Sequence, residues 1–201
     1  SKGLSARDEA QRAFRIARAE WQACNSGAPE ERQMEFVCAI LSKVLGYDTP
    51  KVCPQEGITA EGPAEGMLNF APHELSAVSE TEANEHRYPV TLILGTGTGR
   101  DVLPVIVVPP NVSLDAKYSF KTGQRLTATQ VMQGFLNASQ YYLWALVTNG
   151  SNWRLLCDNP ALSRPCYLDV DLDLLLQEDD SQAFDGIFWR MLHCSRAARR
   201  E

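Results

Sequence analysis

The sequence has no long unbroken hydrophobic run. None of its apolar stretches approaches the roughly 18 residues that a membrane-spanning helix requires. The polar stretch from Ser1 to Arg12 also lacks the apolar segment of a secretory signal peptide. With 201 residues, 44% of them hydrophobic, the chain can bury the core of one domain and carry a helical extension. We therefore expect a cytoplasmic protein with no membrane partner.

Closely spaced metal ligands are also missing. No Cys-x-x-Cys pair occurs, and the histidines cluster neither with one another nor with cysteines. The cysteines are Cys24, Cys38, Cys53, Cys157, Cys166 and Cys194, and the histidines are His73, His86 and His193. We interpret the cysteines as reduced core residues and expect no zinc site. A catalytic histidine is unsupported.

Positive charge is scarce as well. The formal net charge is −6, so bulk electrostatic attraction does not hold this chain on nucleic acid. Any contact with DNA must be local.

Helical periodicity dominates residues 1–47, which we interpret as an N-terminal helical part. Apolar residues recur at three- and four-residue spacing in two segments, with Ala10, Ala13, Phe14, Ala17 and Trp21 in the first and Met34, Val37, Leu41 and Val44 in the second. The second helix is predicted over 30–45, with Gly46 as its C-terminal stop. Residues 48–88 are rich in Gly, Pro, Glu, Ser and Thr, which predicts a loop-rich insert.

Residues 89–201 alternate β-branched runs with helical patterns. Strands are predicted over 89–94, 102–108, 143–148 and 153–157, an edge strand over 166–170, and helices over 128–138 and 184–193. The pair Asn149-Gly150 suits a tight hairpin turn, because both residues tolerate positive φ. The expected fold is α/β (of the α+β kind), a mixed central sheet flanked by helices, with the N-terminal helical part as an extension of the same domain.

The glycines at 95, 97 and 99 resemble the loop by which methyltransferases bind S-adenosylmethionine. Such a loop requires a helix directly after it, whereas the stretch from Arg100 to Pro110 is β-branched and contains three prolines. Ile93 stands where an acidic residue is expected, two positions before the first glycine. We interpret the segment as a hairpin loop and expect no cofactor in this chain.

The stretch from Leu136 onward carries a family resemblance. Its elements are Leu136-Asn137, Leu143-Trp144-Ala-Leu-Val-Thr-Asn149-Gly150, Trp153-Arg-Leu-Leu, Asp158-Asn159-Pro-Ala-Leu162, Arg164, Tyr167-Leu-Asp-Val-Asp171-Leu and Leu192-His193-Cys-Ser195-Arg196. Upstream, Leu103-Pro104-Val105, Leu114-Asp115 and Gln133 extend it to about half of the chain. This pattern resembles the N-terminal region of large adenine-specific DNA methyltransferases, found in bacterial type IIG-like restriction-modification systems and in DISARM- and BREX-like phage-defence systems.

The resemblance carries implications for activity and partners. In such proteins a methyltransferase domain with an Asn-Pro-Pro-aromatic motif follows this region, and no Asn-Pro-Pro occurs here. Methylation and S-adenosylmethionine binding would then belong to an absent downstream domain, and this chain would be a fragment or one piece of a larger polypeptide. The implied partners are DNA, reached through the larger protein, and the downstream domain or defence-system subunits.

A looser similarity links the chain to the nuclease-like domain of type I and type IIG enzymes, which would make its fold a degenerate restriction-nuclease-like one. An active nuclease of this kind places two acids and a lysine around Mg²⁺. The candidates are Asp101, Asp115 and Lys117, with Gln133 on the following helix. The apolar strand that should carry an acid and a lysine has Val107 and Pro109 instead. The alternative is that Asp115 and Lys117 are solvated turn residues and that Gln133 caps or packs a helix.

The remaining candidates are contacts to DNA or to a partner. Three arginines could bind phosphate and two asparagines could donate hydrogen bonds from an exposed loop, namely Arg154, Arg164, Arg196, Asn149 and Asn152. Alternatively, Arg164 and Arg196 hold carboxylates such as Asp158, Asp169 or Asp171. Two function classes follow, a non-catalytic module that positions DNA or partner subunits and a Mg²⁺-dependent nuclease domain. We favour the first.

Overall fold

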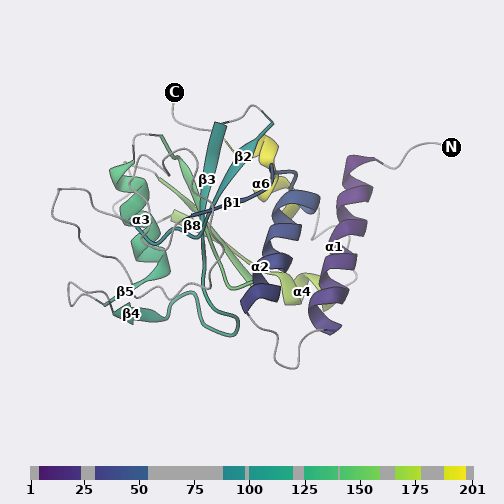
Figure 1. The fold of residues 1–201 in the computed structure, drawn as a ribbon, viewed down its shortest axis with the longest axis horizontal. Helices are drawn as coiled ribbons and strands as arrows, with labels where there is room; N and C mark the ends of the chain where they lie inside the picture. Colours follow the sequence, from purple (N-terminus) through teal and green to yellow (C-terminus); the bar gives the residue numbers. More distant parts are fainter. Residues whose placement is uncertain are drawn as a thin grey trace.

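The architecture is a central sheet between two layers of helices, seen in a computed structural model (Figure 1). The structure describes residues 5–23, 30–53, 88–97, 100–119, 125–139, 141–158, 166–177 and 188–197. The helices are α1 (Ala6–Ala23), α2 (Glu30–Ala39), the π-helix η1 (Ile40–Val44), α3 (Ala128–Ala138), α4 (Leu172–Gln177), α6 (Arg190–Leu192) and the 3-10 helix η3 (Cys194–Arg196). The strands are β1 (Lys51–Val52), β2 (Leu92–Thr96), β3 (Arg100–Val107), β4 (Lys117–Ser119), β5 (Arg125–Thr127), β6 (Trp144–Thr148), β7 (Asn152–Cys157) and β8 (Cys166–Asp171).

Six strands form one mixed sheet in the order β1-β2-β3-β6-β7-β8. All neighbours are antiparallel except β3 and β6, which pair in parallel with Val105 opposite Leu146. Helix α3 lies on the connection between these two strands, as a parallel pair requires a crossover. The predicted fold class, a mixed sheet flanked by helices, is therefore confirmed.

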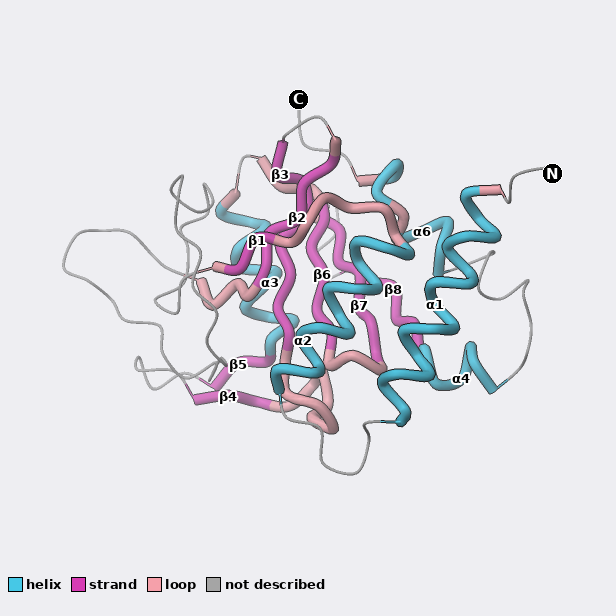
Figure 2. The backbone as a smooth tube through the Cα atoms, turned by 45° about the vertical axis from the view of Figure 1, so that its right-hand side comes forward, coloured by secondary structure: helices cyan, strands magenta, loops and turns pink. Residues whose placement is uncertain are grey.

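Each face of the sheet packs against its own helices, because successive strand residues point to opposite faces. Val105 and Val107 lie in the core shared with α1 and α2, whereas Ile106 and Val108 lie in the core shared with α3. Figure 2 shows α1 and α2 together on one side of the strands and α3 on the other. Because both faces are covered, β3 is a continuous apolar run rather than an alternating one.

The second helix ends where the sequence predicts, although its last turn is wider than an ordinary α-helix. Ile40–Val44 forms a π-helical turn whose Ile40, Leu41 and Val44 side chains are buried. Gly46 then adopts a φ of +74°, the left-handed conformation that stops a helix at little cost for glycine.

Three local predictions need correction. Residues 51–52, expected within a loop, form edge strand β1, which pairs with β2. Strands β4 and β5 form a separate two-stranded sheet that was not predicted. Helix α4 was also not predicted, and it forms because the Asp171 carboxylate accepts the backbone N–H groups of Asp173 and Leu174. The described end of the predicted final helix is helical, since residues 188–189 form a π-helical turn and α6 follows over 190–192, whereas residues 178–187 lie outside the described ones.

The predicted hairpin between β6 and β7 is confirmed, but its turn works differently. Gly150 adopts a φ of +93°, whereas Asn149 does not adopt a positive φ. Instead, Asn149 Oδ1 accepts hydrogen bonds from the backbone N–H groups of Ser151 (3.1 Å) and Asn152 (2.7 Å). The asparagine therefore closes the turn through its side chain rather than through its backbone conformation.

Candidate functional site

The glycine-rich segment is part of a hairpin. Strands β2 and β3 pair in antiparallel fashion, with Thr96 opposite Arg100. A strand rather than a helix therefore follows the glycines, and the strand–loop–helix geometry of a nucleotide-binding loop is not formed here. The hairpin interpretation is confirmed, and the candidate site lies elsewhere on the sheet.

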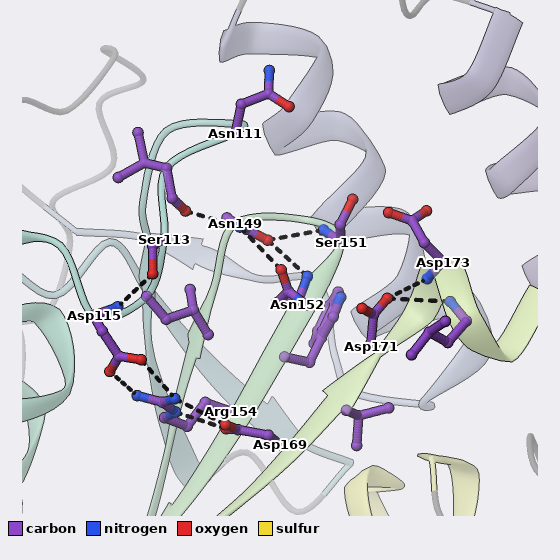
Figure 3. A pocket seen from close by; sticks show the side chains of 15 residues that line it. Asn111, Ser113, Asp115, Asn149, Ser151, Asn152, Arg154, Asp169, Asp171 and Asp173 are labelled. Atoms are coloured by element: carbon purple, nitrogen blue, oxygen red, sulfur yellow. Dashed lines mark hydrogen bonds and ion pairs between the residues drawn. The ribbon is translucent and has the colours of Figure 1, made fainter.

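That site is a polar cluster centred on Arg154 of β7, on the face of the sheet that α3 covers (Figure 3). Four separate elements supply its members. Asp169 lies directly opposite Arg154 on β8, Asp115 comes from the loop after β3, and Thr129 belongs to the first turn of α3. The cluster therefore joins parts of the chain that are far apart in sequence.

Every N–H donor of the Arg154 guanidinium has an acceptor. Nε donates to Asp169 Oδ1 (2.7 Å), and Nη2 donates to Asp169 Oδ2 (2.8 Å) and to Asp115 Oδ2 (3.4 Å). Nη1 donates to Asp115 Oδ1 (2.6 Å) and to Thr129 Oγ1 (3.0 Å). The Tyr167 ring lies 4.3 Å from the guanidinium carbon. Because an arginine has five N–H groups, none remains for an external ligand.

The electrostatics of the cluster follow from this arrangement. The Arg154 side chain is 6% exposed, whereas those of Asp169 and Asp115 are 51% and 68% exposed. The hydrogen bonds to Asp169 and then to Asp115 raise the pKa of Arg154, against the effect of burial. In turn, the hydrogen bond from Arg154 lowers the pKa of Asp115 below its ordinary value. A buried cation is thus neutralised by two carboxylates that remain in contact with water.

A pocket of about 710 Å³ opens beside this cluster (Figure 3). It is lined by four carboxylates and one guanidinium, those of Asp115, Asp169, Asp171, Asp173 and Arg154. Each carboxylate already has an internal role, because Asp171 caps α4 and Asp173 pairs with Arg18 of α1. Among the residues that the structure describes, no group of three or more His, Cys, Asp or Glu side chains is placed to hold a metal ion.

The pocket rim is fixed by Asn149 and Gln33. The Asn149 amide donates to Val112 O (2.9 Å) and to Asn152 Oδ1 (3.4 Å), which ties the β6–β7 turn to the loop after β3. Gln33 is only 3% exposed, and its Nε2 donates to Val108 O (2.8 Å) and Asn149 O (2.7 Å). Sequence reasoning missed Gln33, although its spacing from Val37 and Leu41 places a polar residue on a buried helical stripe.

The predicted nuclease residues do not form one cluster. Asp101 lies on β3, where it pairs with Gly95 of β2. It is five residues, or about 17 Å, along β3 from Ile106, which lies level with Arg154. Lys117 lies on β4 and is exposed. Gln133, on α3, donates to Asn137 Oδ1 (2.9 Å), so it makes a contact within its own helix. Of the four, only Asp115 belongs to the Arg154 cluster.

The predicted contact residues also separate. Asn149 is 7% exposed, so the expectation of an exposed asparagine at this turn is wrong for it, whereas Asn152 is half-buried. Arg196 is exposed on η3, and Arg164 lies outside the described residues. The residue that holds Asp169 is Arg154, whereas the sequence offered Arg164 or Arg196 as the alternative. Only the strand register reveals this pair, because it sets the two residues directly opposite each other.

No family model, curated protein or solved structure matches this chain. None of the helices in the described part of the chain combines the length and apolarity needed to cross a bilayer.

Proposed function

We propose that the chain is a non-catalytic, nuclease-derived domain of a restriction-modification or phage-defence DNA methyltransferase, in which it positions DNA or partner subunits. The motif resemblance from Leu136 onward supports the family. The order of elements supports the nuclease-like ancestry, because a helical start and a β2–β3 hairpin precede a Gln-bearing helix and the Thr-Asn-Gly strand β6.

The observation that carries the non-catalytic assignment is the saturation of Arg154. A metal-dependent nuclease keeps its acids available to Mg²⁺, whereas Asp115 is bound to Arg154 through both carboxylate oxygens. The strand that would carry the acid and lysine has Val105 and Val107 buried against α1 and α2. No acid or lysine of the predicted set therefore stands where two metal ligands and a base would meet.

The charge of the pocket lining indicates which residues could contact DNA. The pocket beside Arg154 has four carboxylates and a guanidinium without a spare donor, so it repels DNA phosphates. Among the predicted contact residues that are described, Arg196 is exposed and does not line this pocket. We therefore assign local phosphate contact to Arg196 rather than to Arg154 or Asn149.

A plasmid assay tests the proposal. The chain is incubated with supercoiled plasmid and Mg²⁺ or Mn²⁺, beside Lys117→Ala and Asp115→Asn, and the nicked fraction is measured. We expect no nicking by wild-type protein whose circular dichroism shows it to be folded. Metal-dependent nicking that disappears in Lys117→Ala would establish the nuclease instead.

Duplex binding tests the positioning role. Fluorescence anisotropy on a labelled duplex, across a range of salt concentrations, is measured for wild type, Arg196→Ala and Arg154→Met. Arg196→Ala is expected to weaken binding and to make the slope of log affinity against log salt concentration shallower by about one, because each phosphate contact releases counterions. Arg154→Met serves as the matched control and leaves the slope unchanged. The reverse pattern would contradict the assignment.

A further inference from the structure

Two cysteines lie directly opposite each other at the end of the β7–β8 ladder. The register pairs Cys157 of β7 with Cys166 of β8, and side chains that are opposite in an antiparallel pair point to the same face of the sheet. The cysteine pair is next along the ladder after the pairs Trp153–Val170 and Leu155–Leu168, on the face of the sheet that packs against α1 and α2. Cys166 is exposed and Cys157 is partly buried.

The ladder sets how far apart the two cysteines lie. Leu172 N donates to Ser151 O (2.9 Å), which makes that pair a hydrogen-bonded one. Pair types alternate along an antiparallel ladder, so the Cys157–Cys166 pair, six residues further on, is hydrogen-bonded too. Such pairs have Cα atoms about 5.5 Å apart, which lies within the range that disulfides span. The Cβ atoms of a hydrogen-bonded pair lie about 5.5 Å apart, against about 3.5–4.5 Å in a disulfide, so closing the bond draws the two strand ends together by about 1 Å.

We propose that Cys157 and Cys166 form an oxidisable dithiol that closes to an intramolecular disulfide across β7 and β8. The oxidant class is a small disulfide such as oxidised glutathione. The exposed Cys166 thiolate attacks one glutathione sulfur, which breaks the S–S bond and releases one glutathione thiolate. The Cys157 thiolate then attacks the Cys166 sulfur of the mixed disulfide and releases the second. Two protein thiols are oxidised, one oxidised glutathione is reduced, and the two released thiolates take up the protons.

The other described cysteines differ from this pair. Burial raises the pKa of Cys38 to about 11, and burial also raises the pKa of Cys194. Cys53 is 1% exposed. These thiols stay protonated or shielded, so oxidation at low oxidant concentration falls on the exposed member of the pair.

The bond would fasten the edge strand that carries Tyr167 and Asp169 against Arg154. Oxidation is therefore expected to slow hydrogen exchange of the β8 backbone amides by about tenfold or more, because a cross-link opposes local opening. This effect does not depend on the function proposed above.

Peptide mapping tests the proposal. The reduced protein is equilibrated with mixtures of oxidised and reduced glutathione, remaining thiols are alkylated, and the monomer band of a non-reducing gel is digested with a protease that cuts before aspartate. Cleavage before Asp115, Asp158 and Asp169 separates the two cysteines into segments 115–157 and 158–168. We expect these segments to be linked in the oxidised sample and to separate on reduction, with both thiols lost in equal amounts.

Variants define the outcomes. Cys157→Ser should leave Cys166 with a bound glutathione and no linked segments, and Cys194→Ser should form the link as wild type does. Glutathione retained on Cys166 of folded wild type would overturn the proposal, because the second thiol would then not reach it. A link found only in dimers would overturn it too, since the bond would be intermolecular.

Discussion

The Arg154 cluster makes a quantitative prediction about charge removal. Replacing Asp115 or Asp169 alone by asparagine leaves one carboxylate to neutralise the buried guanidinium. Both carboxylates are more than half exposed, so each single substitution is expected to cost about 1 kcal/mol, the upper end of the range for exposed ion pairs. The asparagine oxygen still accepts a hydrogen bond in each case.

The double substitution Asp115→Asn/Asp169→Asn removes both counter-charges. The Arg154 side chain is 6% exposed, so its charge then stays buried without a partner, which costs about 3 kcal/mol or more. The loss in free energy of unfolding from the double substitution therefore exceeds the sum of the two single losses by about 1 kcal/mol, because either carboxylate alone neutralises Arg154. Adding Arg154→Met should recover part of this loss, since no unpaired charge remains.

Urea unfolding followed by circular dichroism measures these differences, with the slope of free energy against urea checked for constancy across the variants. Wild type, both singles, the double and the triple variant form the set. Additivity of the two singles within about 0.5 kcal/mol, or no recovery in the triple variant, would refute the reasoning that a shared buried charge couples them.

Three further predictions concern pH and the packing around the site. The hydrogen bond from Arg154 lowers the pKa of Asp115 below its unfolded value of 3.8. The stability that this carboxylate contributes is therefore present above about pH 4 and is lost as the pH falls through the folded pKa. The difference in urea midpoint between wild type and Asp115→Asn should shrink over the same fall in pH. Gln33→Met should cost about 2 kcal/mol in chemical unfolding, because two buried carbonyls lose their donor, and a cost near zero would mean that water replaces it. Gly46→Ala should lower the free energy of unfolding by about 1–2 kcal/mol, because Gly46 has a φ of +74° and an added Cβ would lie 3.1 Å from His193 Nε2. Gly97→Ala is the neutral control, because an added Cβ there meets nothing within 4 Å.

The sequence predicted the elements that local patterns determine. Apolar spacing places α1 and α3, because the buried stripe of an amphipathic helix is visible in one segment alone. Gly46 marks the end of the second helix for a backbone reason that needs no neighbour. Short β-branched runs place β3 and β6, although their boundaries move by one or two residues.

The site was only partly predictable. Asp115 and Arg154 were both candidates, but for separate roles, and nothing local shows that they bind each other across 39 residues. Asp101 was grouped with Asp115 on spacing alone, and the sheet separates them because the strand between is extended. Edge strand β1 was missed because two residues carry no periodicity and depend on pairing with β2.

The sequence by itself determined the longer helical and strand segments, the mixed α/β class and the absence of an Asn-Pro-Pro motif, since each of these is a property of neighbouring residues. The tertiary structure alone decided which carboxylates Arg154 holds and which cysteine faces Cys157. Strand register and crossover packing set those contacts, and both depend on burying two faces of one sheet at once.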